Sequence, residues 1–265
     1  GDGLKMAMAA GAGLGNMTSA WWVPTLAIPE AQWQTGETRN MPVLIERTLP
    51  HGMLVNRDGK RFCNEAANYS ALAGAFHAFD PASYDYPNLP AYLIFDSQYR
   101  ERYPLASFMP GSPLPDWVAV ADSFEALAEK IGVDAKNLPA TVNRFNELAN
   151  QLDDQDFSRG KTDYDRFYGD RSREGAGATL GSLTKPPFYA VEIRMGALGT
   201  NGGAKTNAQA QILDVDGEPI AGLFGAGNVI SAPTGSVYAG AGGTLGPALT
   251  FGYIAGRAAA RLVNQ

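Results

Sequence analysis

The stretch that decides the fold lies near the C-terminus: Gly222-Leu-Phe-Gly-Ala-Gly-Asn228, then Tyr238-Ala-Gly-Ala-Gly-Gly-Thr-Leu-Gly-Pro247, then an apolar run to Val263. The first piece predicts a short buried strand that ends in a glycine turn. The second predicts a loop whose backbone a ligand can approach closely, because it has almost no side chains. Pro247 suits the first position of a helix, since its φ is already helical and its missing N–H would be unpaired there. The N-terminus of that helix then faces the glycine loop and forms an anion site. The alternative is a purely structural glycine-rich turn before a buried helix.

Composition limits the classes of function. The 265 residues allow one large domain or two small ones. A net charge of −6 without a basic run argues against nucleic acid as a partner. The single cysteine, Cys63, excludes an internal disulfide and fits a reducing compartment, and with two histidines it cannot make a usual zinc site. We therefore expect no metal. No apolar run is long enough to span a bilayer and no signal peptide is visible, so we expect a cytoplasmic location. Because Gly1-Asp-Gly3 lacks an initiator Met, we expect the chain to be the C-terminal portion of a longer protein.

The rest of the chain alternates short strands and helices. The first helix is apolar around most of its surface, which predicts that it is buried. The capping-box spacing of Asp122–Glu125 marks the start of one core-facing helix, and Pro139 opens another. Asp58-Gly59 and Asp216-Gly217 mark two hairpin turns. A polar, glycine-rich stretch predicts an exposed loop. In chain order these are a helix over Gly1–Ala12, a hairpin of Met53–Asn56 and Asp58–Phe62, a strand over Ala91–Asp96, a capping box over Asp122–Glu125, a helix opened by Pro139, an exposed loop over Asp153–Gly181, a strand over Pro187–Ile193 and a hairpin over Ala210–Ile220.

The combined motifs resemble the C-terminal signature of FAD-dependent 3-ketosteroid Δ1-dehydrogenases, a branch of the fumarate reductase/succinate dehydrogenase flavoprotein superfamily. The matching pieces are Phe-Gly-Ala-Gly-Asn228, Tyr238-Ala-Gly-Ala-Gly-Gly-Thr-Leu-Gly-Pro-Ala248 and Phe251-Gly-Tyr-Ile-Ala-Gly256. The resemblance covers nearly the whole chain. It implies a fold class of α/β and α+β: the C-terminal part of a Rossmann-like FAD-binding domain with an inserted α+β substrate-capping domain. Residues 1–29 and 200–265 would belong to the FAD-binding domain, and residues 30–199 would form the capping domain.

The resemblance also implies a cofactor site for FAD. The superfamily has a Gly-Asp-Gly whose Asp touches FAD, and Asp2 matches it; helix N-capping is a compatible role. The Asn of Ala-Gly-Asn would contact the ribityl or pyrophosphate region, and the Thr-Leu pair would lie by the isoalloxazine. The helix after Pro247 would direct its dipole at the reduced flavin. The residues assigned to the cofactor are Asp2, Gly227, Asn228, Gly243, Thr244 and Leu245.

Three residues match the family's catalytic positions. The Tyr238 hydroxyl and the Gly242 N–H would bind the ketone oxygen, as an oxyanion hole that stabilises charge when the neighbouring proton is removed. Tyr69, five residues after Asn64, would be the base that removes this proton. A free tyrosine has a pKa of about 10, so such a base needs nearby donors or positive potential. In the family a second tyrosine from the N-terminal half assists; that half is absent from this sequence.

The implied reaction is dehydrogenation of a cyclic ketone, with a 3-ketosteroid as the expected hydrophobic substrate and a separate electron acceptor. Fumarate reductases need an active-site Arg and cations that clamp dicarboxylates, whereas this chain has Gly-Gly-Thr244 and Thr200-Asn201 at those places. A flavin enone reductase and a 3-ketosteroid Δ4-(5α)-dehydrogenase remain alternatives. The N-terminal glycine fingerprint for the ADP half of FAD is also missing. A non-catalytic fragment, pairing with a chain that supplies this fingerprint, is therefore a further alternative.

Overall fold

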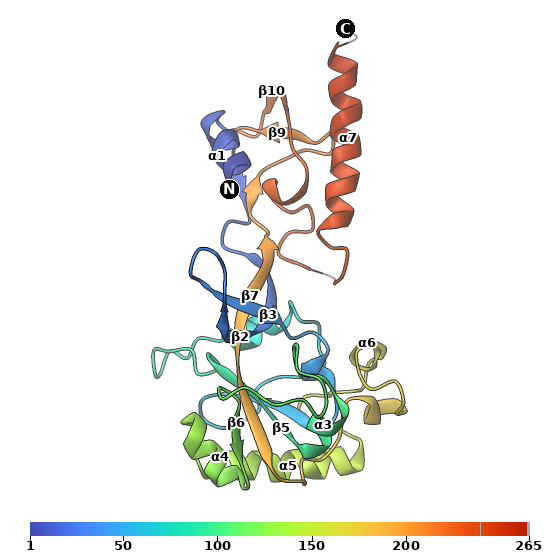
Figure 1. Cartoon of the computed structure of the whole chain (residues 1–265). Coiled ribbons are helices and arrows are strands. Elements are labelled where there is room, and N and C mark those ends of the chain that lie inside the picture. Colours follow the sequence, from blue (N-terminus) through green and yellow to red (C-terminus); the bar gives the residue numbers. More distant parts are fainter. Residues whose placement is uncertain (239, 264–265) are drawn as a thin grey trace. The chain divides into compact units, whose positions relative to one another are not determined.

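The computed structural model describes residues 1–238 and 240–263, so Ala239 of the predicted glycine loop lies outside the described residues (Figure 1). The chain forms two compact units. The split unit consists of residues 1–22 and 197–265, and the central unit of Val23–Gly196. The chain passes between them within strands β2 and β7. The roles predicted for residues 1–29, 30–199 and 200–265, as FAD-binding and capping domains, stay predictions.

The split unit is a small α/β body. Strands β1 and β8 pair antiparallel, with Leu14 opposite Ala204. The predicted hairpin is confirmed: β9 and β10 pair antiparallel, and Gly217 adopts the left-handed φ of +90° that the turn needs. The buried apolar core is small and consists of Ala7, Ala12, Ala204, Ile212 and Ile230. The elements are α1 Asp2–Ala9, β1 Leu14–Gly15, β8 Gly203–Ala204, β9 Gln211–Leu213, β10 Pro219–Phe224, η3 Gly227–Val229 and α7 Leu245–Val263.

Three expectations for the split unit need correction. Helix α7 begins two residues before Pro247, because Gly246 N–H already bonds to the Gly242 carbonyl. The strand before the glycine turn, β10, is largely exposed rather than buried. Helix α1 forms as predicted but buries only Ala7 among its residues. Long apolar side chains are instead exposed on both helices, including Met6, Leu249 and Tyr253. An apolar pattern can report burial only against partners that the chain itself contains.

The central unit is built on a sheet of six strands in the order β3-β2-β7-β5-β4, with β6 also pairing β7. The predicted strand Ala91–Asp96 is confirmed as β5, which pairs antiparallel with both β4 and β7. The elements are β2 Ala20–Gln32, β3 Thr38–Pro42, η1 Glu46–Thr48, β4 Gly52–Val55, α2 Leu72–Phe76, β5 Ala91–Asp96, α3 Ser97–Arg102, β6 Ala119–Ala121, α4 Phe124–Ile131, α5 Asn137–Gln151, α6 Asp163–Phe167, η2 Gly175–Ala178 and β7 Phe188–Thr200.

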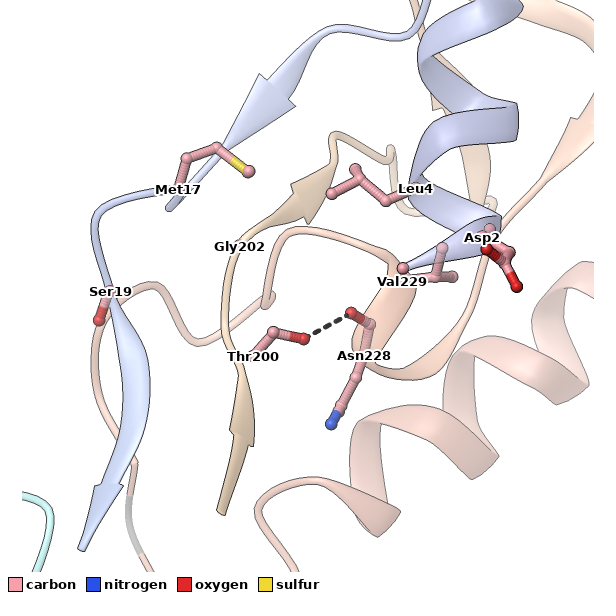
Figure 2. Close-up of a pocket in the computed structure, with 10 residues that line it drawn as sticks. Asp2, Leu4, Met17, Ser19, Thr200, Gly202, Asn228 and Val229 are labelled. Atoms are coloured by element: carbon pink, nitrogen blue, oxygen red, sulfur yellow. Dashed lines mark hydrogen bonds between the residues drawn. The ribbon is translucent and has the colours of Figure 1, made fainter. Parts of the chain in front are cut away.

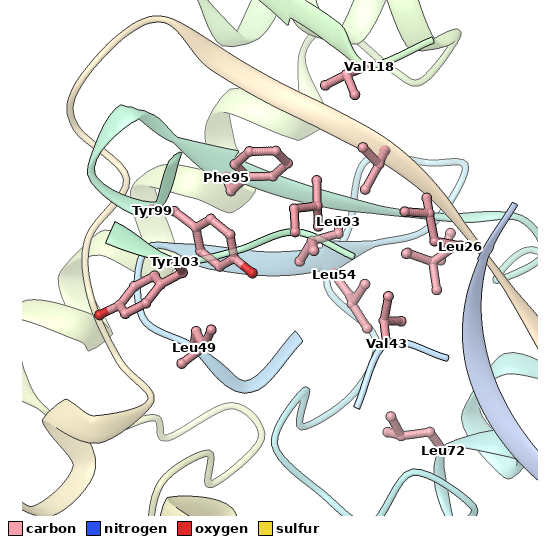
Figure 3. Packing of buried hydrophobic residues seen from close by; sticks show 14 of the residues in the cluster. Leu26, Val43, Leu49, Leu54, Leu72, Leu93, Phe95, Tyr99, Tyr103 and Val118 are labelled. Carbon is pink, nitrogen blue, oxygen red and sulfur yellow. The ribbon is translucent and has the colours of Figure 1, made fainter. Parts of the chain in front are cut away.

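Both faces of this sheet are covered along β4 and β5. Alternate residues of a strand point to opposite faces, so Met53 and Ile94 join α4 and α5 in one core. Leu54 and Phe95 join a second core with Leu72 of α2 and Tyr99 of α3, shown in Figure 3. A sheet buried on both sides is a rigid base for the loops at its edges.

Local sequence signals in the central unit predict the turns correctly but not the elements next to them. Asn56 Oδ1 accepts bonds from Asp58 N and Lys60 N, which closes the turn, but the predicted second strand does not form, since β4 pairs with β5 instead. The cap of α4 is Ser123, one residue after the start of the predicted capping box; its hydroxyl accepts from Ala126 N. The predicted exposed loop over Asp153–Gly181 contains α6 and η2 and includes buried charged residues, so that prediction is wrong.

Candidate functional site

A hollow of about 390 Å³ lies in the split unit, beside the N-terminus of α1 (Figure 2). It falls within the range of small-molecule sites. Its polar side chains are a carboxylate, an amide and two hydroxyls, which suit a ligand rich in hydroxyl groups. The lining residues include Asp2, Ser19, Thr200 and Asn228.

Backbone constraints hold Asn228 in this hollow. The preceding Gly227 has a left-handed φ of +73°, and the Thr200 hydroxyl donates to the Asn228 carbonyl over 3.3 Å (Figure 2). A Cβ on Gly199 would lie 2.8 Å from Asn228 Nδ2, so glycine is needed there for the amide to keep its position. Asp2 is exposed as the first residue of α1, and Gly1 rather than Asp2 is the N-cap.

The glycine loop packs directly on an aromatic pair. The ring of Tyr238, which is 9% exposed, lies 4.9 Å from the ring of Trp21 between centroids. A Cβ on Gly243 would come within 2.5 Å of Tyr238 Cε2, so the phenol ring lies against bare backbone. The neighbouring Gly242 has a φ of +93° that other residues rarely adopt, and open space surrounds the position of its missing Cβ. The Tyr238 ring and the backbone of Gly243 are therefore packed against each other.

A second, narrow cleft joins the loop to the hollow. Gly227, Asn228, Gly243 and Thr244 all line it, together with Trp21. The structure thus brings together four of the six residues assigned to the cofactor in this cleft. Asp2 lines the hollow, with which the cleft shares Thr200 and Asn228, and Leu245 is exposed at the start of α7. Whether these residues bind a cofactor stays a prediction at this point.

Tyr69 belongs to the central unit, and its side chain is 3% exposed. Two turns closed by asparagine side chains flank it: Asn64 Oδ1 accepts from Ala66 N, and Asn68 Oδ1 accepts from Ser70 N, both over 2.9 Å. These bonds fix the backbone on both sides of Tyr69. Tyr69 and Tyr238 lie in different units.

Sequence reasoning missed a buried ionic cluster below the segment that carries Tyr69. Arg61 donates to both oxygens of Glu65 over 2.9 and 2.8 Å, and also to Asp154. Arg159 approaches Glu65 to 3.1 Å, and the side chains of Glu65, Asp154 and Arg159 are fully buried. Burial alone would raise the pKa of Glu65, but Arg61 and Arg159 bring it below its ordinary value. The polar, glycine-rich sequence of residues 153–181 did not indicate that Asp154 and Arg159 form buried ion pairs.

Two titratable residues to which no chemistry was assigned are buried in structural roles. His51 lies between the Ser182 carbonyl, 2.8 Å from Nδ1, and Arg173, whose Nη2 is 2.8 Å from Nε2. This arrangement places the ring proton on Nδ1 and leaves Nε2 to accept from Arg173. Burial lowers the pKa of His51 despite the bond to Ser182. Cys63 is a buried free thiol whose pKa burial raises.

Comparison with known protein families finds a match over residues 1–245 to the FAD-binding domain family. The chain belongs to this family. Over 262 residues it is 45% identical to the 4-oxocyclohexanecarboxylate 2-dehydrogenase of Sinomonas cyclohexanicum, in a match that covers 97% of this chain and 44% of that protein. It is 40% identical over 265 residues to the 3-oxosteroid 1-dehydrogenase of Mycobacterium tuberculosis strain H37Rv, covering 96% of this chain and 45% of that protein.

A solved structure resembles the whole fold. It is the 3-ketosteroid delta1-dehydrogenase from Sterolibacterium denitrificans in complex with 1,4-androstadiene-3,17-dione, at a TM-score of 0.87 and 37% identity. The match covers 98% of this chain and 47% of that one. The chain therefore spans slightly less than half the length of the relatives that it matches. Within the described residues, no helix is both long and apolar enough to cross a membrane.

The residues of the split unit fit part of FAD. Carboxylate, amide and hydroxyl groups suit the ribityl hydroxyls, and the space around the missing Cβ of Gly242 is open. The family assignment confirms FAD as the expected cofactor.

Proposed function

We propose that this chain supplies the ketone-binding and capping parts of an FAD-dependent dehydrogenase, which oxidises a cyclic ketone at the carbon pair next to its carbonyl. One observation carries the proposal: the Tyr238 ring packs on Gly243, beside the left-handed Gly242. We take the Tyr238 O–H and the Gly242 N–H as two donors to one ketone oxygen. An oxyanion hole needs this arrangement.

The proposed chemistry starts at the ketone oxygen. The Tyr238 hydroxyl and the Gly242 N–H donate to it, and both bonds strengthen as negative charge develops during removal of the α-proton. Tyr69, acting as the tyrosinate, takes this proton as the general base and becomes the neutral phenol. Bound FAD would accept the hydride from the neighbouring carbon. Asp2 and Asn228 would hold the ribityl chain, and Thr244 and Leu245 would border the ring system. A separate electron acceptor would complete turnover.

The two units have different proposed roles. The split unit would hold the flavin end of FAD, and the remaining part of a full-length relative would bind the ADP half. The central unit would cap the substrate. It contains an apolar hollow of about 460 Å³, whose lining includes Leu44, exposed Ile45 and Pro104. The mainly apolar lining of this hollow would suit a hydrocarbon ligand.

The substrate we favour is a 3-ketosteroid. Its rings carry no charge, and the hollow already contains the acidic side chains Glu46 and Asp170. Burial opposes ionisation of Asp170, but hydrogen bonds from Ser172 and Tyr103 outweigh it and lower its pKa to about 2, so it is a carboxylate at neutral pH. A second candidate is a small oxocyclohexanecarboxylate, which the 45% identity to a dehydrogenase of that substrate favours. A carboxylate that entered the apolar hollow of the central unit would be repelled by Asp170.

The test is anaerobic bleaching of the flavin in the full-length protein. A neutral 3-ketosteroid and 4-oxocyclohexanecarboxylate are added to separate samples, and absorbance loss is followed. Fast bleaching by the steroid alone supports our choice, and fast bleaching by the carboxylate alone selects the second candidate. Oxidation of a reduced sample by an enone, without bleaching by either ketone, would mean an enone reductase. A protein that binds no flavin would be a non-catalytic fragment.

A further inference from the structure

Arg47 is an unusual residue of the central unit, because it is fully buried and makes little use of its donors. Its Nη1 donates to the backbone carbonyl of Glu65. Among the described residues, its Nε and Nη2 have no hydrogen-bond partner. Burial lowers its pKa to about 10, since the low-dielectric interior disfavours the charged form. A buried guanidinium with one such bond is costly for the fold, so stability alone does not explain its place.

The atom that Arg47 binds belongs to the segment that carries Tyr69. Glu65 is anchored twice: its carbonyl by Arg47 of η1, and its carboxylate by Arg61, Arg159 and the Leu54 N–H of β4. Glu65 lies within the turn that the Asn64 side chain closes, and the chain continues from this turn to Tyr69. Asn64 Nδ2 also donates to Asp165 of α6 over 3.1 Å.

These anchors come from separate parts of the chain. Arg47 lies in η1, Leu54 in the central sheet, and Arg159 in the loop before α6; Arg159 also donates to the carbonyls of Gly52 and Leu49 over 2.9 Å. The chain at Asn64 and Glu65, shortly before Tyr69, is therefore held at several points by other elements of the central unit. Of these points, Arg47 is the one that binds the backbone of the segment without also neutralising a carboxylate.

We propose that Arg47 is a positioning residue for Tyr69: its bond to the Glu65 carbonyl sets where the Tyr69 hydroxyl stands when a ketone is bound. This inference rests on the proposed role of Tyr69 as the base. Arg47 touches neither substrate nor cofactor in this role and acts through the backbone between Glu65 and Tyr69. A small displacement of a base is enough to slow proton transfer strongly, because the reacting atoms must meet at hydrogen-bond distance.

The test uses the full-length protein with FAD bound. Arg47→Met replaces the buried cation by an apolar side chain of similar length and removes the bond to Glu65. We expect flavin reduction at saturating 3-ketosteroid to slow on the order of ten- to a hundredfold. Flavin content and the ketone concentration at half-saturation should change little. Arg100→Met is the matched control, because Arg100 is also buried and also donates to backbone carbonyls, those of Met109 and Ser112. Its rate at saturation should stay within about twofold of the parent.

A double variant separates positioning from a general structural loss. If Arg47 acts through Tyr69, then Arg47→Met should slow the Tyr69→Phe protein hardly at all, since energies of residues that act as a unit are not additive. An equal slowing in both backgrounds would overturn the proposal, and so would a parental rate for Arg47→Met. If Arg47→Met does not fold, Arg47→Lys decides: its shorter side chain should give an intermediate loss, and a parental rate refutes positioning.

The same samples separate this inference from the function on which it rests. If Tyr69→Phe reduces flavin at the parental rate, Tyr69 is not the base, and the proposed mechanism fails with the positioning role. If Tyr69→Phe is slow while Arg47→Met is fast, the mechanism stands and only the role of Arg47 is wrong.

Discussion

Replacing Tyr238 by phenylalanine tests the proposed oxyanion hole most directly. The substitution removes one hydroxyl and keeps the ring, which packs 4.9 Å from the Trp21 ring and against Gly243. Because these contacts belong to the ring, we expect the fold and the flavin content of the full-length protein to hold. The enolate oxygen would keep only the Gly242 N–H.

The expected loss depends on the number of donors. Removing one donor of an oxyanion hole costs roughly 2.7–4 kcal/mol of transition-state stabilisation, or on the order of a hundred- to a thousandfold in rate. Most of this loss should fall on the rate at saturating ketone rather than on ketone binding, because charge reaches the oxygen only as the proton leaves.

The assay is stopped-flow reduction of the flavin by a 3-ketosteroid without oxygen. Tyr253→Phe is the matched control, since Tyr253 lies in the same unit, is exposed on α7 and uses its hydroxyl only to accept from Arg257 among the described contacts. Its rate should equal that of the parent. A parental rate for Tyr238→Phe would show that the ketone is not held there, and the reasoning from the glycine loop would be refuted.

Three further sets of substitutions test other contacts. Gly243→Ala places a Cβ 2.5 Å from Tyr238 Cε2, so the ring must move and flavin reduction should slow about tenfold or more, whereas Gly246→Ala meets open space and should not change it. His51 has a pKa below its ordinary value when folded, so the unfolded chain binds more protons as the pH falls below about 6.5. Thermal melting between pH 8 and pH 5 should therefore show stability falling toward acid, and a smaller fall in His51→Gln; equal slopes would contradict this. Glu65→Gln leaves buried arginines underpaired and should lower the free energy of unfolding by about 3–5 kcal/mol in denaturant titrations; a loss below about 1 kcal/mol would be inconsistent with the ionic cluster.

The sequence was most informative where one local signal determines the structure. A run of five apolar residues between Pro90 and Asp96 is enough to mark Ala91–Asp96 as a strand, and an Asp-Gly pair is enough to mark the turn at Gly217. The glycine loop was also predictable as a loop next to a helix start. Motif resemblance then identified the family, which the match over residues 1–245 confirmed.

Sequence reasoning failed where long-range pairing decides. The stretch from Asp153 onward looks solvated by composition, yet Asp154 and Arg159 are buried because their charges are matched by Arg61 and Glu65, far away in the chain. The Asp58-Gly59 turn formed, but residues 58–62 did not form a second strand. Instead, β4 pairs with β5, which is distant in the sequence. The contact between Tyr238 and Gly243 is likewise a tertiary detail, and spacing alone gave no means to derive it.

The division of the split unit between the two ends of the chain has a consequence for biosynthesis. Leu14 of β1 pairs with Ala204 of β8, 190 positions later in the sequence. At a translation rate of about 5–20 residues per second, β1 leaves the ribosome roughly 10–40 s before its partner strand exists. The contiguous central unit can fold during that interval, while the edge of β1 that pairs with β8 waits for that strand and can be reached by chaperones and proteases. Substitutions at Leu14 and Gly15 should therefore alter how much protein a cell accumulates more than how fast each finished molecule works.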